Sequence, residues 1–132
     1  MSRAILDTSV VIASGEDPRL LRNLPTECAV SVATLAELHF GVDLAKTPQI
    51  RAQRLQRLGA IEAAFEALPI DASVARAYAT VAHAVARAGR KPRARVMDLW
   101  IAATALVHAT PILTLNPRDF EGLDDLVKVR TV

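Results

Sequence analysis

A short apolar segment interrupted by one acid constrains this chain more than any other feature. Residues 4–12 are apolar except for Asp7, Thr8 and Ser9. An apolar run of this kind predicts a buried strand of a parallel sheet. A buried strand does not tolerate an unpaired carboxylate, because removing the charge from water is costly. We therefore expect Asp7 at the end of the first strand, at the sheet edge where open α/β proteins bind ligands.

The rest of the chain alternates short apolar runs with helical patterns. Strands are expected at residues 3–6, 28–32, 68–70, 111–115 and 127–129. Helices are expected from residue 8 to a break at 15–18, and at 19–24, 34–45, 48–67, 72–88 and 96–109, with a basic loop at 90–95. Thr47 and Asp71 are expected as helix N-caps, with Pro48 at a first helical position. This alternation predicts a three-layer α/β/α domain with a mainly parallel sheet of about four to five strands.

Composition narrows the class of protein. The 132 residues are 52% apolar and 23% charged, which suits one globular domain over residues 1–132. The single cysteine, Cys28, excludes an internal disulfide and a thiolate metal cluster. No apolar stretch approaches the length of a membrane span, and no signal peptide precedes the first strand. We expect a cytoplasmic protein that does not enter a membrane.

Four acids share a position at the ends of predicted elements. Asp7 ends the first strand, Glu37 lies in the first turn of the helix after the second strand, Asp98 lies in the first turn of a late helix, and Asp119 follows the fourth strand. Carboxyl ends of parallel strands share one edge of the sheet, so these acids are expected together there. For Asp98 this requires that its helix start at the same edge. Such a group suits Mg²⁺ or Mn²⁺, which prefer oxygen ligands.

Each acid also has a structural explanation. Glu37 completes a possible capping box with Thr34, Asp98 complements a helix dipole, and Asp119 suits a turn. Asp7 is the hardest to explain in this way. The hydroxyls of Thr8, Ser9 and Thr114 are expected to support a metal-bound water or a phosphate. Bound metal lowers the pKa of water and stabilises charge on a phosphodiester.

Basic residues gather in two places, and the net charge is +2. Arg51, Arg54 and Arg57 follow one helix face, which is either a solvated face or a polyanion contact. A run without acids contains Arg87, Arg90, Lys91, Arg93 and Arg95 and ends just before Asp98. Arg93 and Arg95 are the candidate contacts to an RNA backbone. Aromatic residues make up only 4% of the chain, so we expect RNA recognition to depend little on base stacking.

Four motifs together resemble those of PIN-domain ribonucleases, and more narrowly the VapC toxins of bacterial type II toxin–antitoxin systems. The motifs lie at residues 6–9, 34–38, 97–105 and 114–120. The resemblance implies a PIN-like fold and an endoribonuclease that needs Mg²⁺ or Mn²⁺. It places Asp7, Glu37, Asp98 and Asp119 on the acidic positions, with Asn116 able to share or replace the role of Asp119. Met97 departs from the family, where Asn often precedes the third acid.

The resemblance also implies partners. These are an RNA substrate (tRNA, rRNA or mRNA), a second copy in a homodimer, and a cognate VapB-type antitoxin that inhibits the enzyme. Two other functions stay open from the residues themselves. An aspartate-based phosphatase built on Asp7 usually has a second acid two positions later, where this chain has Ser9. A non-catalytic dimeric binding module would use the acids as caps and the basic run for a partner.

Overall fold

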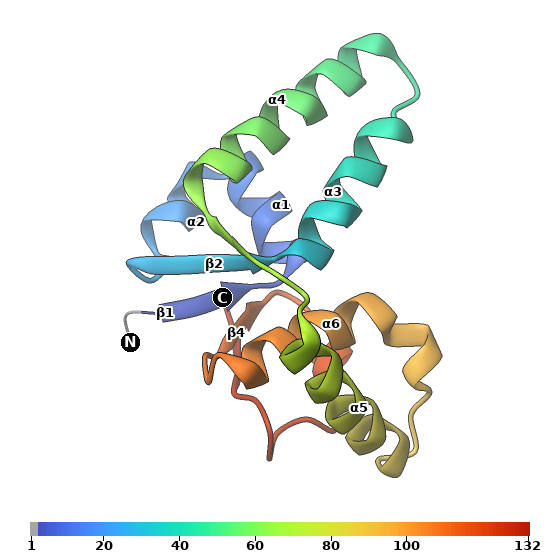
Figure 1. The fold of residues 1–132 in the computed structure, drawn as a ribbon. Helices are drawn as coiled ribbons and strands as arrows, with labels where there is room; N and C mark the ends of the chain where they lie inside the picture. Colours follow the sequence, from blue (N-terminus) through green and yellow to red (C-terminus); the bar gives the residue numbers. More distant parts are fainter. Residues whose placement is uncertain (1–2) are drawn as a thin grey trace.

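A five-stranded parallel sheet forms the centre of the protein in a computed structural model that describes residues 3–132 (Figure 1). The strands are β1 (Arg3–Leu6), β2 (Glu27–Ser31), β3 (Glu66–Leu68), β4 (Ile112–Thr114) and β5 (Val129–Thr131). Their order is β3-β2-β1-β4-β5, and every pairing is parallel. The predicted sheet is confirmed. The proposed single domain also includes Met1 and Ser2, which lie outside the described residues.

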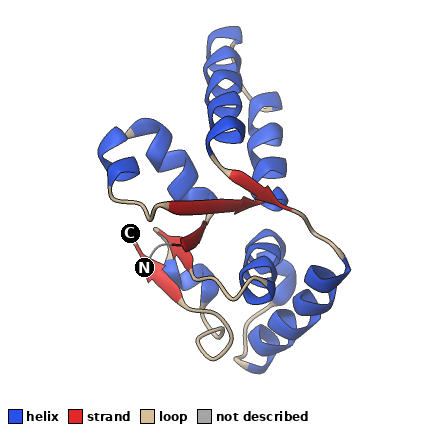
Figure 2. Ribbon diagram, turned by 60° about the vertical axis from the view of Figure 1, so that its left-hand side comes forward, coloured by secondary structure: helices blue, strands red, loops and turns tan. Residues whose placement is uncertain are grey.

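Helices cover both faces of this sheet. They are α1 (Thr8–Glu16), α2 (Pro18–Arg22), α3 (Val32–Asp43), α4 (Pro48–Ala64), α5 (Ala72–Arg87) and α6 (Val96–Val107), with 3₁₀ turns η1 (Pro92–Arg95) and η2 (Pro117–Phe120). In Figure 1, α1, α2 and α4 lie above the sheet and α5 and α6 below it. Figure 2 shows the strands between these two groups of helices, which confirms the three-layer prediction. None of the helices in residues 3–132 is long and apolar enough to span a membrane.

Alternation along the strands divides the core between the two faces. Ile5 and Ile112 pack in the cluster formed with α5 and α6, whereas their neighbours Leu6 and Leu113 pack in the cluster with Val10 of α1. This follows from the two-residue period of a strand. Fully burying each such side chain contributes about 1.5–3 kcal/mol. The central strands are therefore held from both sides, which gives a rigid platform for the loops at their ends.

Predicted element ends differ from the structure where apolar residues pack without being in strands. β3 ends at Leu68, before Ile70, and β5 begins at Val129, after Val127. Both Ile70 and Val127 pack in the core with α5 and α6. The apolar pattern marked burial correctly and the strand boundaries wrongly. The predicted N-caps are confirmed, since Thr47 accepts from the Ile50 amide and Asp71 from the Val74 amide.

The direction of α6 decides where Asp98 lies. α6 ends at Val107 and a short connection leads into the start of β4. The helix therefore begins at the carboxyl edge of the sheet and ends at the amino edge, where β4 starts. Asp98 is in the first turn of α6, so it lies at the same edge as Asp7. The orientation that the prediction required is present.

Candidate active site

Asp7 is a buried carboxylate held by hydroxyl groups. It lies between β1 and α1 and is 3% exposed. Its Oδ2 accepts hydrogen bonds from Ser9 Oγ at 2.7 Å and from Thr114 Oγ1 at 2.8 Å. Asp7 occupies the N-cap position of α1, but its side chain makes no capping bond. The buried charge is therefore stabilised by two neutral donors, which leave its negative charge in place.

Glu37 lies one turn further into its helix than predicted. α3 begins at Val32, and Ser31 caps it by accepting from the Ala33 amide. Glu37 is consequently in the second turn, and the capping box with Thr34 is wrong. Instead, Thr8 Oγ1 donates to Glu37 Oε1 at 2.8 Å and lies 3.0 Å from Thr34 Oγ1. The structure thus gives Thr34, which is buried, a supporting position that sequence reasoning missed.

Asp98 and Asp119 form the other half of the site and share one arginine. Arg95 Nη1 donates to Asp119 Oδ1 at 2.6 Å and lies 3.8 Å from Asp98 Oδ2. The three side chains are 31%, 29% and 23% exposed, in the order Arg95, Asp119 and Asp98. The sequence predicts Arg95 as an RNA contact, and nothing in it links Arg95 to Asp119, 24 residues away. Its ion pairs come from the packing of η1 and η2 beside the start of α6.

The charges of Asp7 and Glu37 act on the other half of the site, which contains Asp98 and Asp119. Burial, together with the negative charges of Asp119, Asp7 and Glu37, raises the pKa of Asp98 to about 7, although the nearby Arg95 guanidinium lowers it. Interactions of this kind fall with distance, so Asp7, Glu37 and Asp119 each lie close enough to Asp98 to affect its pKa. They are not packed into a closed cage: within residues 3–132 no three His, Cys, Asp or Glu side chains are already grouped to hold a metal ion.

The remaining predicted support residues connect the acids to β4. The Leu115 amide donates to Ser9 Oγ at 3.2 Å, and the Asn116 amide donates to Thr114 Oγ1 at 2.9 Å. Asn116 is exposed, and this contact uses its backbone. The hydroxyls expected to face water or phosphate thus position carboxylates in this structure. Arg93 is exposed on η1, where a large ligand can reach it.

The three arginines on the basic face of α4 contact other groups of the same protein. Arg54 donates to the Gly41 carbonyl at 2.6 Å, Arg51 lies 3.8 Å from Asp43, and Arg57 lies 3.8 Å from Glu16. These contacts tie α4 to α3 and α1. The solvated-face interpretation is closer to the structure than the polyanion one.

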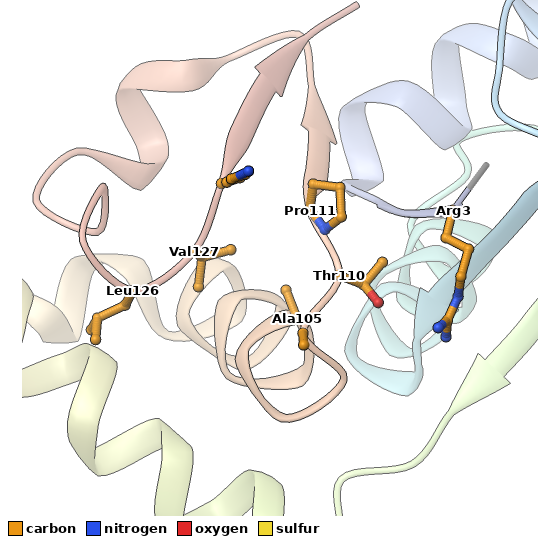
Figure 3. A pocket seen from close by; sticks show the side chains of 8 residues that line it. Arg3, Ala105, Thr110, Pro111, Leu126 and Val127 are labelled. Carbon is orange, nitrogen blue, oxygen red and sulfur yellow. The ribbon is translucent and has the colours of Figure 1, made fainter. Parts of the chain in front are cut away.

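Two hollows flank the sheet at opposite edges. One of about 610 Å³ lies at the amino ends of the strands, lined by Arg3, Thr110 and Pro111 among others (Figure 3). A second, of about 410 Å³, lies between α1, α3 and α4 and is lined by Thr8 and Glu37 as well as by apolar side chains. The second adjoins the acids, whereas the first is remote from them. The candidate catalytic acids and the 610 Å³ hollow therefore lie at opposite ends of the strands.

Known proteins resemble this chain over nearly its whole length. The PIN domain family model matches residues 4–126. "Ribonuclease VapC5" of Mycobacterium tuberculosis is 43% identical, covering 97% of this chain and 93% of that protein. "Ribonuclease VapC4" of the same organism is 40% identical, with coverages of 98% and 97%.

A solved structure agrees with these sequence comparisons. It is the crystal structure of VapBC-5 from Mycobacterium tuberculosis, described as a member of the VapBC family of toxin–antitoxin systems. A chain of that structure is 41% identical to this one, with a TM-score of 0.81 and coverages of 100% of this chain and 98% of that chain. The chain belongs to the PIN-domain family and, within it, to the VapC ribonucleases.

Proposed function

We propose that this protein is the toxin of a type II toxin–antitoxin system and acts as a metal-dependent endoribonuclease. The observation that supports the proposal is the electrostatic effect of Asp119, Asp7 and Glu37 on Asp98 in a chain that belongs to the VapC ribonucleases. RNA hydrolysis requires stabilisation of negative charge on the phosphodiester. The site is rich in anionic oxygens, so it needs a cation before it can approach RNA.

The residues present fit a hard divalent cation, and Mg²⁺ or Mn²⁺ is our choice. The available donors are carboxylate oxygens, which these ions prefer. The pKa of Asp98 is raised first by burial and then by repulsion from the other acids, and a bound cation would offset both effects. Asp7, Glu37 and Asp98 would hold the ion, with Asp119 or Asn116 completing the site. When bound, it would activate water and offset the charge that develops on the phosphate.

The chain's own residues fix the geometry of this reaction. Ser9 and Thr114 hold one oxygen of Asp7, and Thr8 holds one oxygen of Glu37. Each carboxylate keeps its second oxygen for other ligands. Arg93, which is exposed, and Arg95, which is partly buried, lie on η1 just before α6 and are the proposed contacts to the RNA backbone.

The proposed partners follow from the same relatives. VapBC-5 is described as a toxin–antitoxin system, so we expect a VapB-type antitoxin that blocks this site. The hollow between α1, α3 and α4 includes Thr8 and Glu37, which makes it a route by which a bound segment would cover the acids. We also propose that the protein forms a homodimer in the cytoplasm and that its substrate is a tRNA, an rRNA or an mRNA.

Cleavage mapping would test this function. Purified wild type, Asp98→Asn and the exposed-acid control Asp124→Asn are incubated with total RNA and Mn²⁺, and new RNA ends are sequenced. We expect discrete cuts with wild type and with Asp124→Asn, none with Asp98→Asn, and none after chelation. Full cleavage by Asp98→Asn would refute the mechanism.

The two rival functions predict different results. A phosphatase would leave a covalent phosphate on Asp7, although the position that usually holds a second acid is Ser9, whose hydroxyl bonds to Asp7. A binding module would bind no Mn²⁺ and cut no RNA. The VapC relatives favour the ribonuclease over both.

A further inference from the structure

Arg95 is placed where a metal ion would compete with it. It is the last residue of η1 and occupies the N-cap position of α6. A single nitrogen, Nη1, reaches Asp119 at 2.6 Å and Asp98 at 3.8 Å. Among residues 3–132, Arg95 is the one cationic residue that forms ion pairs with the four acids. The positive charge in the site is thus supplied by the chain itself.

Partial burial makes this contact more than a surface ion pair. All three side chains are less than one-third exposed, so solvent screens them less than it screens a fully exposed pair. A charge-assisted bond at 2.6 Å is also short. A cation bound at Asp119 or Asp98 would bring a second positive charge beside the Arg95 guanidinium in a partly buried site. Repulsion between these two charges favours movement of the guanidinium away from the acids.

We propose that Arg95 is an internal counter-ion that is exchanged for the divalent cation. This rests on the proposed function, since it assumes that the acids bind metal. In the metal-free protein the guanidinium neutralises part of the charge on Asp98 and Asp119. Metal binding displaces it, and its flexible stem then lets the planar fork turn to a phosphate of RNA. The same residue lowers metal affinity before RNA arrives and contributes to RNA binding afterwards.

Metal titration without RNA would test the exchange. Mn²⁺ binding is measured by calorimetry for wild type, Arg95→Gln, Arg95→Lys and the matched control Arg93→Gln, which removes an exposed arginine from the same turn. We expect Arg95→Gln to bind Mn²⁺ roughly three- to tenfold more tightly, the range for losing a competing ion pair. Arg95→Lys, which keeps the charge, and Arg93→Gln should stay within about twofold of wild type.

The possible outcomes separate this proposal from the function on which it rests. Wild-type binding with unchanged or weaker binding by Arg95→Gln would overturn the exchange and leave the ribonuclease intact. Absence of Mn²⁺ binding in both proteins would overturn both. Binding by Arg95→Gln but not by wild type would support the exchange strongly.

An experiment on the wild type avoids any dependence on how the variants fold. The Arg95 Nε–H signal in a ¹⁵N spectrum is assigned by its loss in Arg95→Lys, and diamagnetic Mg²⁺ is then added. We expect this signal to shift as the ion binds, while the Arg54 signal, whose guanidinium contacts Gly41, stays in place. An Arg95 signal that does not move while Mg²⁺ binds would contradict the exchange.

Discussion

The two halves of the acidic site are supported in different ways. Asp7 and Glu37 accept hydrogen bonds from the hydroxyls of Ser9, Thr114 and Thr8. Asp98 and Asp119 face the guanidinium of Arg95. A hydroxyl orients a carboxylate without cancelling its charge, whereas a guanidinium does both. Asp7 and Glu37 are therefore held in place without loss of charge. The net charge around Asp98 and Asp119 depends instead on the position of the flexible Arg95 side chain.

The largest expected effect comes from removing charge on the hydroxyl-supported half. Asp7→Asn keeps the shape and the contacts of Oδ2 but removes the negative charge. We expect RNA cleavage to fall more than about 100-fold, since outer partners of metal sites alone cost 10- to 100-fold. Kinetics of cleavage measure it, with Asp125→Asn as an exposed control. Retention of activity would show that Asp7 is structural and that the two halves do not act together.

The arginine-supported half should control how stability depends on pH. The folded pKa of Asp98, about 7, exceeds the unfolded value near 4. The folded state thus binds more protons between these values, and the metal-free protein should lose stability as pH rises from about 4 to 7. Asp98→Asn should remove this slope and stabilise the protein at pH 7 by on the order of 2 kcal/mol, allowing for screening.

Denaturant titrations at several pH values, with a chelator present, would measure that slope. Asp7→Asn is the matched comparison on the hydroxyl-supported half. A slope that persists unchanged in Asp98→Asn would assign it to another group and weaken the electrostatic link between the halves.

A smaller effect is expected from removing one hydroxyl that holds Asp7. Thr114→Val keeps the shape of the buried side chain but deletes its donor to Asp7 Oδ2. Loss of a hydrogen bond to a charged group should cost about 1.5–3 kcal/mol of stability. Metal affinity should fall about tenfold. Thermal unfolding and Mn²⁺ titration check the two effects, and no change in either would mean that Ser9 suffices.

The smallest expected effect is at Thr34, which touches Thr8 and not an acid directly. Thr34→Val should cost about 0.5–1.5 kcal/mol of stability, as for one neutral hydrogen bond. Cleavage should change only a few-fold, because Thr8 still donates to Glu37. A loss as large as that of Thr114→Val would show that the Thr34 contact, too, is needed to orient its carboxylate.

The sequence alone determined the parallel sheet, the layers and the caps at Thr47 and Asp71, and it placed Asp7 at the end of the first strand. These features are encoded locally, because alternation, capping and apolar runs act over a few residues. Asp7 is the clearest case, since an acid that ends a buried apolar strand must lie at the edge of the sheet and not inside the core.

Tertiary structure alone decided which group supports each acid. The pairing of Thr8 with Thr34, of Thr114 with Asp7, and of Arg95 with Asp119 joins elements 24 to 107 residues apart. Nothing in local spacing selects among the many hydroxyls and arginines of the chain. Packing of α6, η1 and η2 against the sheet brings particular donors within bonding distance, and hydrogen bonds and ion pairs form only at that range.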